Sequence, residues 1–261
     1  MKLEYSYYKN EIKSLFKEIF KETESFCEMI FENKLSESDI FGEIIGKELA
    51  AITFAIPFSA KIKSKKEKCL YIYGVGVKDK YRGNGISKKI LDEIFDYYKN
   101  KNIAFLYLVP ADKNLFLMYE KMGFTTEFYL NVREYNLKNA MPFLYDIKDG
   151  DFYSDYEEYI KKFDTVILRS KKDNEITLKY TTYKKAGNSG FLFEVSDDTV
   201  YIRESFIYDE DDLHSFLYFL KINGYKKAIV INCGHKKNPY AMARKYTAID
   251  LSGGYTNMNF D

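Results

Sequence analysis

The sequence contains no tryptophan, and it is poor in cysteine, histidine and proline. Its 261 residues include three widely separated cysteines, two histidines and four prolines. No CxxC pair is present, so the composition argues against a structural zinc site, any other metal site or a disulfide framework, and it favours a reducing cytoplasm. We expect Cys27, Cys69 and Cys233 to be small buried hydrophobic residues, because no neighbouring histidine or basic pair would activate their thiols.

The chain also lacks an excess of charge and any long hydrophobic run. Its 40 Lys+Arg residues balance 39 Asp+Glu residues, so there is no general electrostatic reason to bind nucleic acid or an anionic membrane. The apolar stretch at 49–56 is far shorter than the ~20 residues that span a bilayer. Residues 1–16 are charged throughout, unlike a signal peptide. We therefore expect a cytoplasmic protein without a nucleic-acid or membrane partner, and the sequence leaves its oligomeric state open.

What is abundant points to two folded domains. Hydrophobic residues make up 46% of the chain and aromatic residues 18%, which is enough for a large core and excludes disorder. A chain of this length typically forms two domains of about 100–150 residues. Lysine supplies nearly all the basic residues, and only five arginines occur. An arginine inside a glycine-rich loop therefore stands out.

The first half alternates strand and helix patterns. Apolar residues at three- and four-residue spacing over 9–34 predict two successive amphipathic helices. A tight turn near Gly46 separates two strands within 40–58, and the basic run at 60–68 is interpreted as a solvated hairpin loop. The remaining predicted elements are a strand at 69–77, a helix at 86–99, a strand at 103–109, a helix at 114–122 and a strand at 124–135. This β–β–β–α–β–α–β order predicts an α/β (α+β) fold with a mixed central sheet flanked by helices.

A segment around Pro142 suggests the boundary between two domains, 1–138 and 139–261. The second domain is predicted to be smaller and also α/β. Its predicted elements are helices at 151–163 and 209–222, strands that include 175–183 and 226–233, and a short helix from 239 to 246. The pattern weakly repeats that of the first half, but it lacks a glycine loop between strand and helix. If the repeat is real, only the first half retains an anion-binding site.

The most informative segment is YGVGVKDKYRGNGISKKIL, residues 73–91. It is not a dinucleotide fingerprint, because the third glycine would fall at Asp79, and no Gly-Lys-Ser/Thr closes a Walker loop. It does place a strand, a turn over 82–85 and a helix start at Ile86 in succession. Glycines let several backbone N–H groups converge, and the helix N-terminus adds partial positive charge. With Arg82 in the same turn, the segment predicts a site for a di-anion such as a pyrophosphate.

Two motifs give the sequence a family resemblance. Residues 80–85 (KYRGNG) match the pattern Gln/Arg-x-x-Gly-x-Gly/Ala, and residues 119–124 (YEKMGF) match a Tyr followed by Glu-Lys-x-Gly-Phe. With this order and spacing, residues 1–135 resemble the GNAT superfamily of acyl-CoA-dependent N-acetyltransferases. The second half resembles, in architecture alone, the degenerate half of tandem-GNAT proteins such as the enhanced-intracellular-survival type, and is expected to be a smaller GNAT-like domain.

The resemblance implies a role for each matching position. The pyrophosphate of acetyl-CoA would bind the main chain of Arg82, Gly83, Asn84, Gly85, Ile86 and Ser87. Val75, Gly76 and Val77 would pair with the pantetheine arm, and the Val75 N–H would polarise the thioester carbonyl. A bulge made easy by the glycines near Val75 would splay this strand from the strand at 103–109. Tyr119 would protonate the departing thiolate as a general acid.

Two positions depart from the family pattern. Lys80 stands where the family has Gln or Arg, which keeps charge but loses forked hydrogen bonding. Asp112 stands where the family often has an asparagine that contacts the cofactor, and it remains a candidate acceptor. The general base is left open, with five candidates: Glu28, Glu32, Tyr71, Tyr73 and the C-terminal carboxylate of Asp261.

The resemblance therefore implies an N-acetyltransferase. It would transfer an acetyl group directly from acetyl-CoA to a primary amine of a small-molecule or peptide acceptor, without a metal and without a covalent acyl-enzyme. The alternative is a non-catalytic acyl-CoA-binding or scaffold protein. A third interpretation is an enzyme that uses a longer acyl-CoA.

Overall fold

The computed structural model describes residues 1–142, 146–233 and 238–257. The chain forms two compact units that exchange segments. Unit 1 comprises Met1–Ala60, Lys66–Thr126 and Ala241–Asp250, and unit 2 comprises Lys61–Lys65, Glu127–Tyr240 and Leu251–Asp261. The predicted boundary between residues 138 and 139 lies inside unit 2, because strand β6 (Thr125–Asn136) runs on into that unit.

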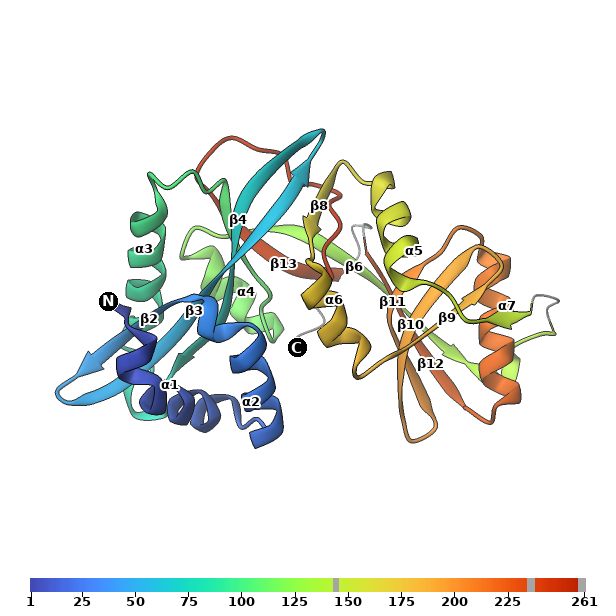
Figure 1. Cartoon of the computed structure of the whole chain (residues 1–261), viewed down its shortest axis with the longest axis horizontal. Helices are drawn as coiled ribbons and strands as arrows, with labels where there is room; N and C mark the ends of the chain where they lie inside the picture. Colours follow the sequence, from blue (N-terminus) through green and yellow to red (C-terminus); the bar gives the residue numbers. More distant parts are fainter. Residues whose placement is uncertain (143–145, 234–237, 258–261) are drawn as a thin grey trace. The chain divides into compact units, whose positions relative to one another are not determined.

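Unit 1 contains six strands and four helices of the described chain (Figure 1). In chain order they are β1 (Lys2–Leu3), α1 (Tyr5–Phe20), α2 (Glu24–Asn33), β2 (Asp39–Ile45), β3 (Glu48–Ile62), β4 (Lys65–Val77), α3 (Ile86–Tyr98), β5 (Phe105–Leu108), α4 (Lys113–Glu120) and most of β13 (Asn238–Lys245). The strand order is β1-β2-β3-β4-β5-β13, and β4 and β5 are parallel. The predicted β–β–β–α–β–α–β succession and the mixed α/β fold class are confirmed.

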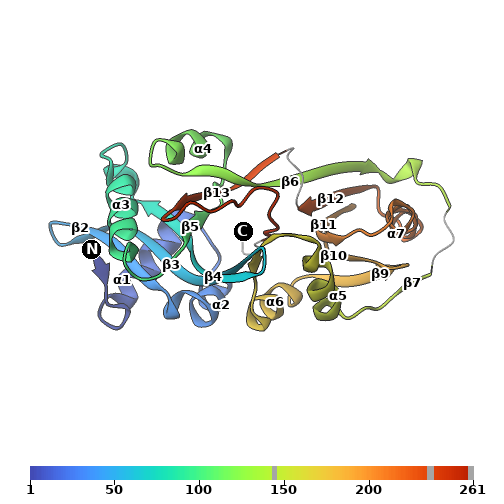
Figure 2. The same ribbon diagram turned by 90° about the horizontal axis from the view of Figure 1, so that it is seen from above.

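Helices cover both faces of this sheet, as the contacts of β4 illustrate. Its successive residues point to opposite faces, so Ile72 packs in a buried cluster with α3 and α4 whereas Tyr73 contacts Phe16 of α1. Figure 2 shows α2 and α4 on opposite sides of β4 and β5. A strand covered on both faces carries apolar residues continuously, as residues 69–77 do.

Unit 2 is built around a set of parallel and antiparallel strands. Its elements are β6, β7 (Ile147–Lys148), α5 (Phe152–Tyr159), β8 (Thr165–Leu168), α6 (Lys171–Leu178), β9 (Thr182–Ala186), β10 (Ser189–Ser196), β11 (Thr199–Phe206), α7 (Glu210–Ile222) and β12 (Lys227–Cys233). The strand order is β6-β12-β11-β10-β9-β7, with β11 and β12 parallel. Helix α7 packs on one face against Val200 and Ile202, and α5 packs on the other against Leu192 and Phe206.

The predicted helix at 239–246 is wrong, because these residues form strand β13. Met242 to Lys245 pair antiparallel with Leu108 to Phe105 of β5, and Met242 is fully buried. Ala, Met, Arg and Lys all favour helices locally, but pairing with the open edge of β5 outweighs that preference. Pro239 lies at the beginning of the strand, where a missing N–H is tolerated.

The predicted strand at 175–183 is also wrong over most of its length. Residues 171–178 form α6, which begins with a capping box: the Ser170 side chain accepts from the Asp173 N–H, and the Asp173 carboxylate accepts from the Ser170 N–H. This reciprocal pair satisfies two amides of the first turn and starts the helix. The basic run at 60–68 is mostly strand as well, since only residues 63 and 64 separate β3 from β4.

Candidate active site

A glycine loop lies between the end of β4 and the beginning of α3. A short 3₁₀ turn, η2 (Asp79–Tyr81), leads into it, and Gly83 and Gly85 have φ of 82° and 73°. These left-handed conformations favour glycine. A Cβ added to either glycine would meet nothing within 4 Å, so the outer surface of the loop is open. Gly85 is the N-cap of α3 and supplies no side chain to its amides, which leaves them directed to this surface.

The side chains of this loop hold its own backbone. The Arg82 guanidinium donates from Nε to the Val77 carbonyl at 3.1 Å and pairs with Asp79 at 2.9 Å. The Asn84 amide donates to the Tyr81 carbonyl at 3.1 Å. Residues 82–85 are exposed, Ser87 is half-buried and Ile86 is buried in the core. The Arg82 N–H donates to the Asp79 carbonyl at 3.1 Å, so the loop is braced from within, while its backbone from Gly83 to Gly85 and the side chain of Arg82 are exposed.

Strand β4 continues past its pairing with β5 before the chain reaches the loop. Their parallel register covers three residue pairs and ends at Tyr71 opposite Tyr107, whereas β4 continues to Val77. Gly74 has a φ of 64°, a left-handed conformation that favours glycine. Gly74 lies three residues past the last pair of this register, and β5 itself ends at Leu108, so the splay of the two strands stays a prediction, with Val75, Gly76 and Val77 on the unpaired end of β4.

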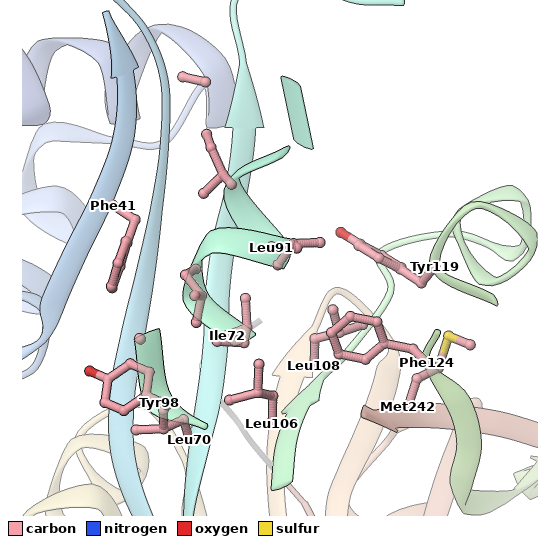
Figure 3. Packing of buried hydrophobic residues seen from close by; sticks show 14 of the residues in the cluster. Phe41, Leu70, Ile72, Leu91, Tyr98, Leu106, Leu108, Tyr119, Phe124 and Met242 are labelled. Carbon is pink, nitrogen blue, oxygen red and sulfur yellow. The ribbon is translucent and has the colours of Figure 1, made fainter. Parts of the chain in front are cut away.

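Tyr119 lies on α4 and belongs to the same buried cluster as Val77. Val75 packs against this cluster. Figure 3 shows the Tyr119 ring beside Phe124 and its hydroxyl directed toward Leu91 of α3. The side chain is 5% exposed, and among the described residues its hydroxyl has no hydrogen-bond partner. Burial, with a smaller contribution from the Asp112 charge, raises the pKa of Tyr119 to about 12. The phenol is therefore protonated at neutral pH and able to donate.

Asp112 has a structural role in this fold. It is the N-cap of α4, and its Oδ1 accepts from the amides of Asn114 at 2.7 Å and Leu115 at 3.2 Å. The cap explains why the helix that carries Tyr119 begins where it does. A contact of the same carboxylate with a cofactor stays a prediction.

The candidate general bases differ in how far they are buried. Glu28 and Glu32 are exposed on α2, whereas Tyr71 is 1% exposed and Tyr73 is half-buried. Asp261 lies outside the described residues.

Burial raises the pKa of the thiols of Cys27, Cys69 and Cys233, so none of them resembles an activated nucleophile. The described part of the chain has no group of three or more His, Cys, Asp or Glu side chains that could hold a metal ion.

Residues 6–126 match the family model of the acetyltransferase (GNAT) domain. This segment is a GNAT domain. No curated protein sequence matches the chain. Within the described residues, no helix has the length and apolar character needed to cross a membrane.

Solved structures share the fold over nearly the whole chain. A conserved protein of unknown function from Enterococcus faecalis V583, a probable N-acyltransferase, is 17% identical, with a TM-score of 0.77, covering 97% of this chain and 73% of its own. A GCN5-related N-acetyltransferase from Anabaena variabilis is 14% identical, with a TM-score of 0.74, covering 92% and 71%. Saccharomyces cerevisiae N-myristoyltransferase with bound myristoyl-CoA is 11% identical, with a TM-score of 0.55, covering 99% and 81%. The GNAT domain supports acyl transfer from an acyl-CoA.

Sequence reasoning missed one residue at this site. Glu48, at the beginning of β3, accepts from the Lys80 ammonium at 2.5 Å and from the Tyr81 hydroxyl at 2.9 Å. A carboxylate next to a predicted anion site has no signal in the sequence, because thirty residues separate it from Lys78, its other partner.

Proposed function

We propose that the protein is an N-acetyltransferase that transfers an acetyl group from acetyl-CoA directly to a primary amine of a small-molecule or peptide acceptor. One observation carries the proposal. The open glycine loop at the start of α3 follows the end of β4 that extends past its pairing with β5, and Tyr119 lies in the same cluster as Val77 of that end. This arrangement supports an anion site at the loop, a path for the extended cofactor arm along β4, and Tyr119 as the proton donor.

The residues divide the chemistry between them. The amides of 83–87 would bind the pyrophosphate, and the Val75 N–H would donate to the thioester carbonyl oxygen as negative charge develops there. The amine nitrogen would form a bond to the carbonyl carbon while the carbon–sulfur bond breaks. Tyr119 would give its proton to the sulfur, and the surplus proton of the amine would pass to water, from which Tyr119 is reprotonated. The buried, unactivated thiols support direct transfer without an acyl-enzyme.

Contacts beside the β4 glycines support a short acyl group. A Cβ on Gly76 would approach Ile19 and Phe20 of α1 to 3.0 Å, and one on Gly74 would approach Phe54 to 3.3 Å. The space on this face of β4 is therefore filled by apolar side chains next to the expected thioester. A longer acyl chain would have to displace them, which favours acetyl-CoA.

Replacing Phe20 with alanine should broaden the acyl preference. The half-buried ring closes the space beside Gly76, so its removal should raise kcat/KM for butanoyl-CoA relative to acetyl-CoA by about tenfold. The ratio is measured from CoA release with one amine acceptor. Phe95→Ala is a matched control, because Phe95 is also half-buried in unit 1 but stacks on Tyr246. An unchanged ratio in folded Phe20→Ala would refute the assignment.

We propose further that unit 2, which contains most of the second half predicted as residues 139–261, is a degenerate GNAT-like domain without a cofactor site. β10, β11, α7 and β12 repeat the order of β3, β4, α3 and β5, including the parallel pair. The segment between β11 and α7 contains no glycine, and the cap Asp209 is followed by Glu210 and Asp211. Carboxylates at that helix N-terminus occupy its amides or repel phosphate.

The test begins with cofactor binding. Calorimetry should detect binding of CoA and acetyl-CoA, and a screen of amines for CoA release should identify the acceptor class among aminoglycosides, polyamines, amino acids and peptide amines. Absence of acetyl-CoA binding by the folded protein would contradict the proposal. Tight binding with no transfer to any amine would instead support the alternative, a non-catalytic acyl-CoA-binding or scaffold protein.

A further inference from the structure

Glu48 connects the beginning of β3 to the segment that enters the glycine loop. It follows the hairpin turn at Gly46 and lies thirty or more residues from its partners in sequence. Its Oε1 accepts from the Lys78 ammonium at 2.9 Å. Its Oε2 accepts from the Lys80 ammonium at 2.5 Å and the Tyr81 hydroxyl at 2.9 Å. Both carboxylate oxygens are thus used on one short segment.

Lys78 is held at the same place by two further contacts. Its ammonium also pairs with Glu18 of α1 at 3.0 Å, and its backbone N–H donates to the Ala50 carbonyl of β3 at 2.9 Å. The residue that follows β4 is therefore fixed by both a helix and a neighbouring strand. The 3₁₀ turn η2, which follows immediately, is fixed at Lys80 and Tyr81 by Glu48.

The electrostatics make this carboxylate unexpected. Hydrogen bonds from Lys78, Lys80 and Tyr81 lower the pKa of Glu48 to about 2, so it is ionised at any physiological pH. A negative charge close to an anion site raises the energy of the bound anion. It also engages the ammonium of Lys80, a cation that the neighbouring loop would otherwise offer to phosphate. Its location is explained if the fixed geometry of the loop lowers the free energy of the bound cofactor by more than the repulsion from the Glu48 charge raises it.

We infer that Glu48 is a positioning residue for the phosphate loop: by holding Lys78, Lys80 and Tyr81 it fixes the turn from which the amides of residues 83–87 would bind phosphate. This inference rests on the proposed function, since it assigns the loop to the pyrophosphate of acyl-CoA. It also assigns Lys80 to the support of the loop, so that Lys80 acts through Glu48 and not as a phosphate ligand.

Glu48→Ala tests the inference by separating binding from turnover. We expect the Kd for CoA and the KM for acetyl-CoA to rise about tenfold, with kcat changed by no more than about twofold, because the loop amides lose their fixed arrangement but Tyr119 does not move. With acetyl-pantetheine, which has no pyrophosphate, kcat/KM should equal that of the unmodified protein. Glu48→Gln, which keeps an acceptor oxygen, should show a smaller change and serves if the alanine variant folds poorly.

Glu43→Ala is the matched control. Glu43 lies on β2 and pairs with the Lys89 ammonium of α3 at 2.5 Å, so it also joins a strand to the region of the loop. Its partner Lys89 lies beyond the loop, however. We therefore expect the Kd for CoA and the KM for acetyl-CoA to stay within about twofold of those of the unmodified protein. Lys80→Met removes one of the three contacts of Glu48, so we expect a smaller rise in Kd and KM than in Glu48→Ala, and the double variant should be no worse than Glu48→Ala alone.

A second readout is independent of catalysis. Amide hydrogen exchange at residues 79–86 in the ligand-free protein should be at least about fivefold faster in Glu48→Ala than in Glu43→Ala. Unchanged exchange, tighter CoA binding, or an equal loss with acetyl-pantetheine would each overturn the inference while leaving the proposed function intact. Failure of the unmodified protein to bind CoA would instead overturn the proposed function, and the inference with it.

Discussion

Replacing Tyr119 with phenylalanine should lower kcat for acyl transfer by about 10²- to 10³-fold, the range expected when a general acid is removed. The substitution deletes one oxygen and keeps the ring, which packs edge-on against Phe124 at 5.9 Å between centroids. The hydroxyl has no partner among the described residues, so its loss should leave the fold and the glycine loop unchanged. We therefore expect the Kd for CoA, measured by calorimetry, to stay within about twofold while CoA release falls.

Tyr98→Phe is the control for this prediction. Tyr98 lies in the same buried cluster, but its hydroxyl donates to Asp39, away from the proposed chemistry. It should leave kcat unchanged. Full turnover in Tyr119→Phe would exclude the general-acid role and leave water as the proton donor.

The pH profile gives an additional check on Tyr119. Because burial raises its pKa to about 12, the acid stays protonated as pH rises through the neutral and mildly alkaline range. Any loss of kcat above neutrality but below about pH 11 must then come from another group, and the Tyr119→Phe variant should keep the same limb.

The parts of the site that could be predicted from sequence are local ones. Glycine at positions 83 and 85 indicates a turn, and both residues have left-handed backbone in the structure. The helix that follows them begins at Ile86, where its apolar stripe begins. The positions of Val75 and Tyr119 followed from motifs at fixed spacing, and the structure places both against one cluster. Their catalytic and binding roles stay predictions.

What could not be predicted depends on contacts between distant segments. Strand β13 consists of residues that favour a helix in isolation, and only the edge of β5, more than a hundred residues earlier, makes it a strand. The same exchange moves the boundary between units away from Pro142. Helix α6 is different: its capping box, Ser170 with Asp173, was visible in the sequence and marks the helix start.

Glu204→Gln should be the most destabilising conservative change in unit 2. The Glu204 carboxylate accepts two bonds from one Arg169 nitrogen, each of 2.9 Å, and the two side chains are 1% and 2% exposed. Arg169 also donates to the Asn257 carbonyl at 3.2 Å and lies 4.5 Å over the Tyr156 ring. Neutralising Glu204 leaves a buried guanidinium without a counter-charge, which costs about 3–5 kcal/mol of unfolding free energy.

Comparison with an exposed ion pair of the same geometry shows whether the loss of stability comes from burial or from pairing alone. Glu210 accepts from one Arg133 nitrogen through both carboxylate oxygens, at 3.0 and 2.8 Å, but its side chain is 57% exposed. Glu210→Gln should therefore cost no more than about 1 kcal/mol in denaturant unfolding followed by circular dichroism. The double variant Arg169→Met/Glu204→Met should be more stable than Glu204→Gln, because it removes the unpaired charge together with its partner. If Glu204→Gln cost no more than Glu210→Gln, the charge of Arg169 would have to be stabilised by its other contacts, such as the Asn257 carbonyl and the Tyr156 ring.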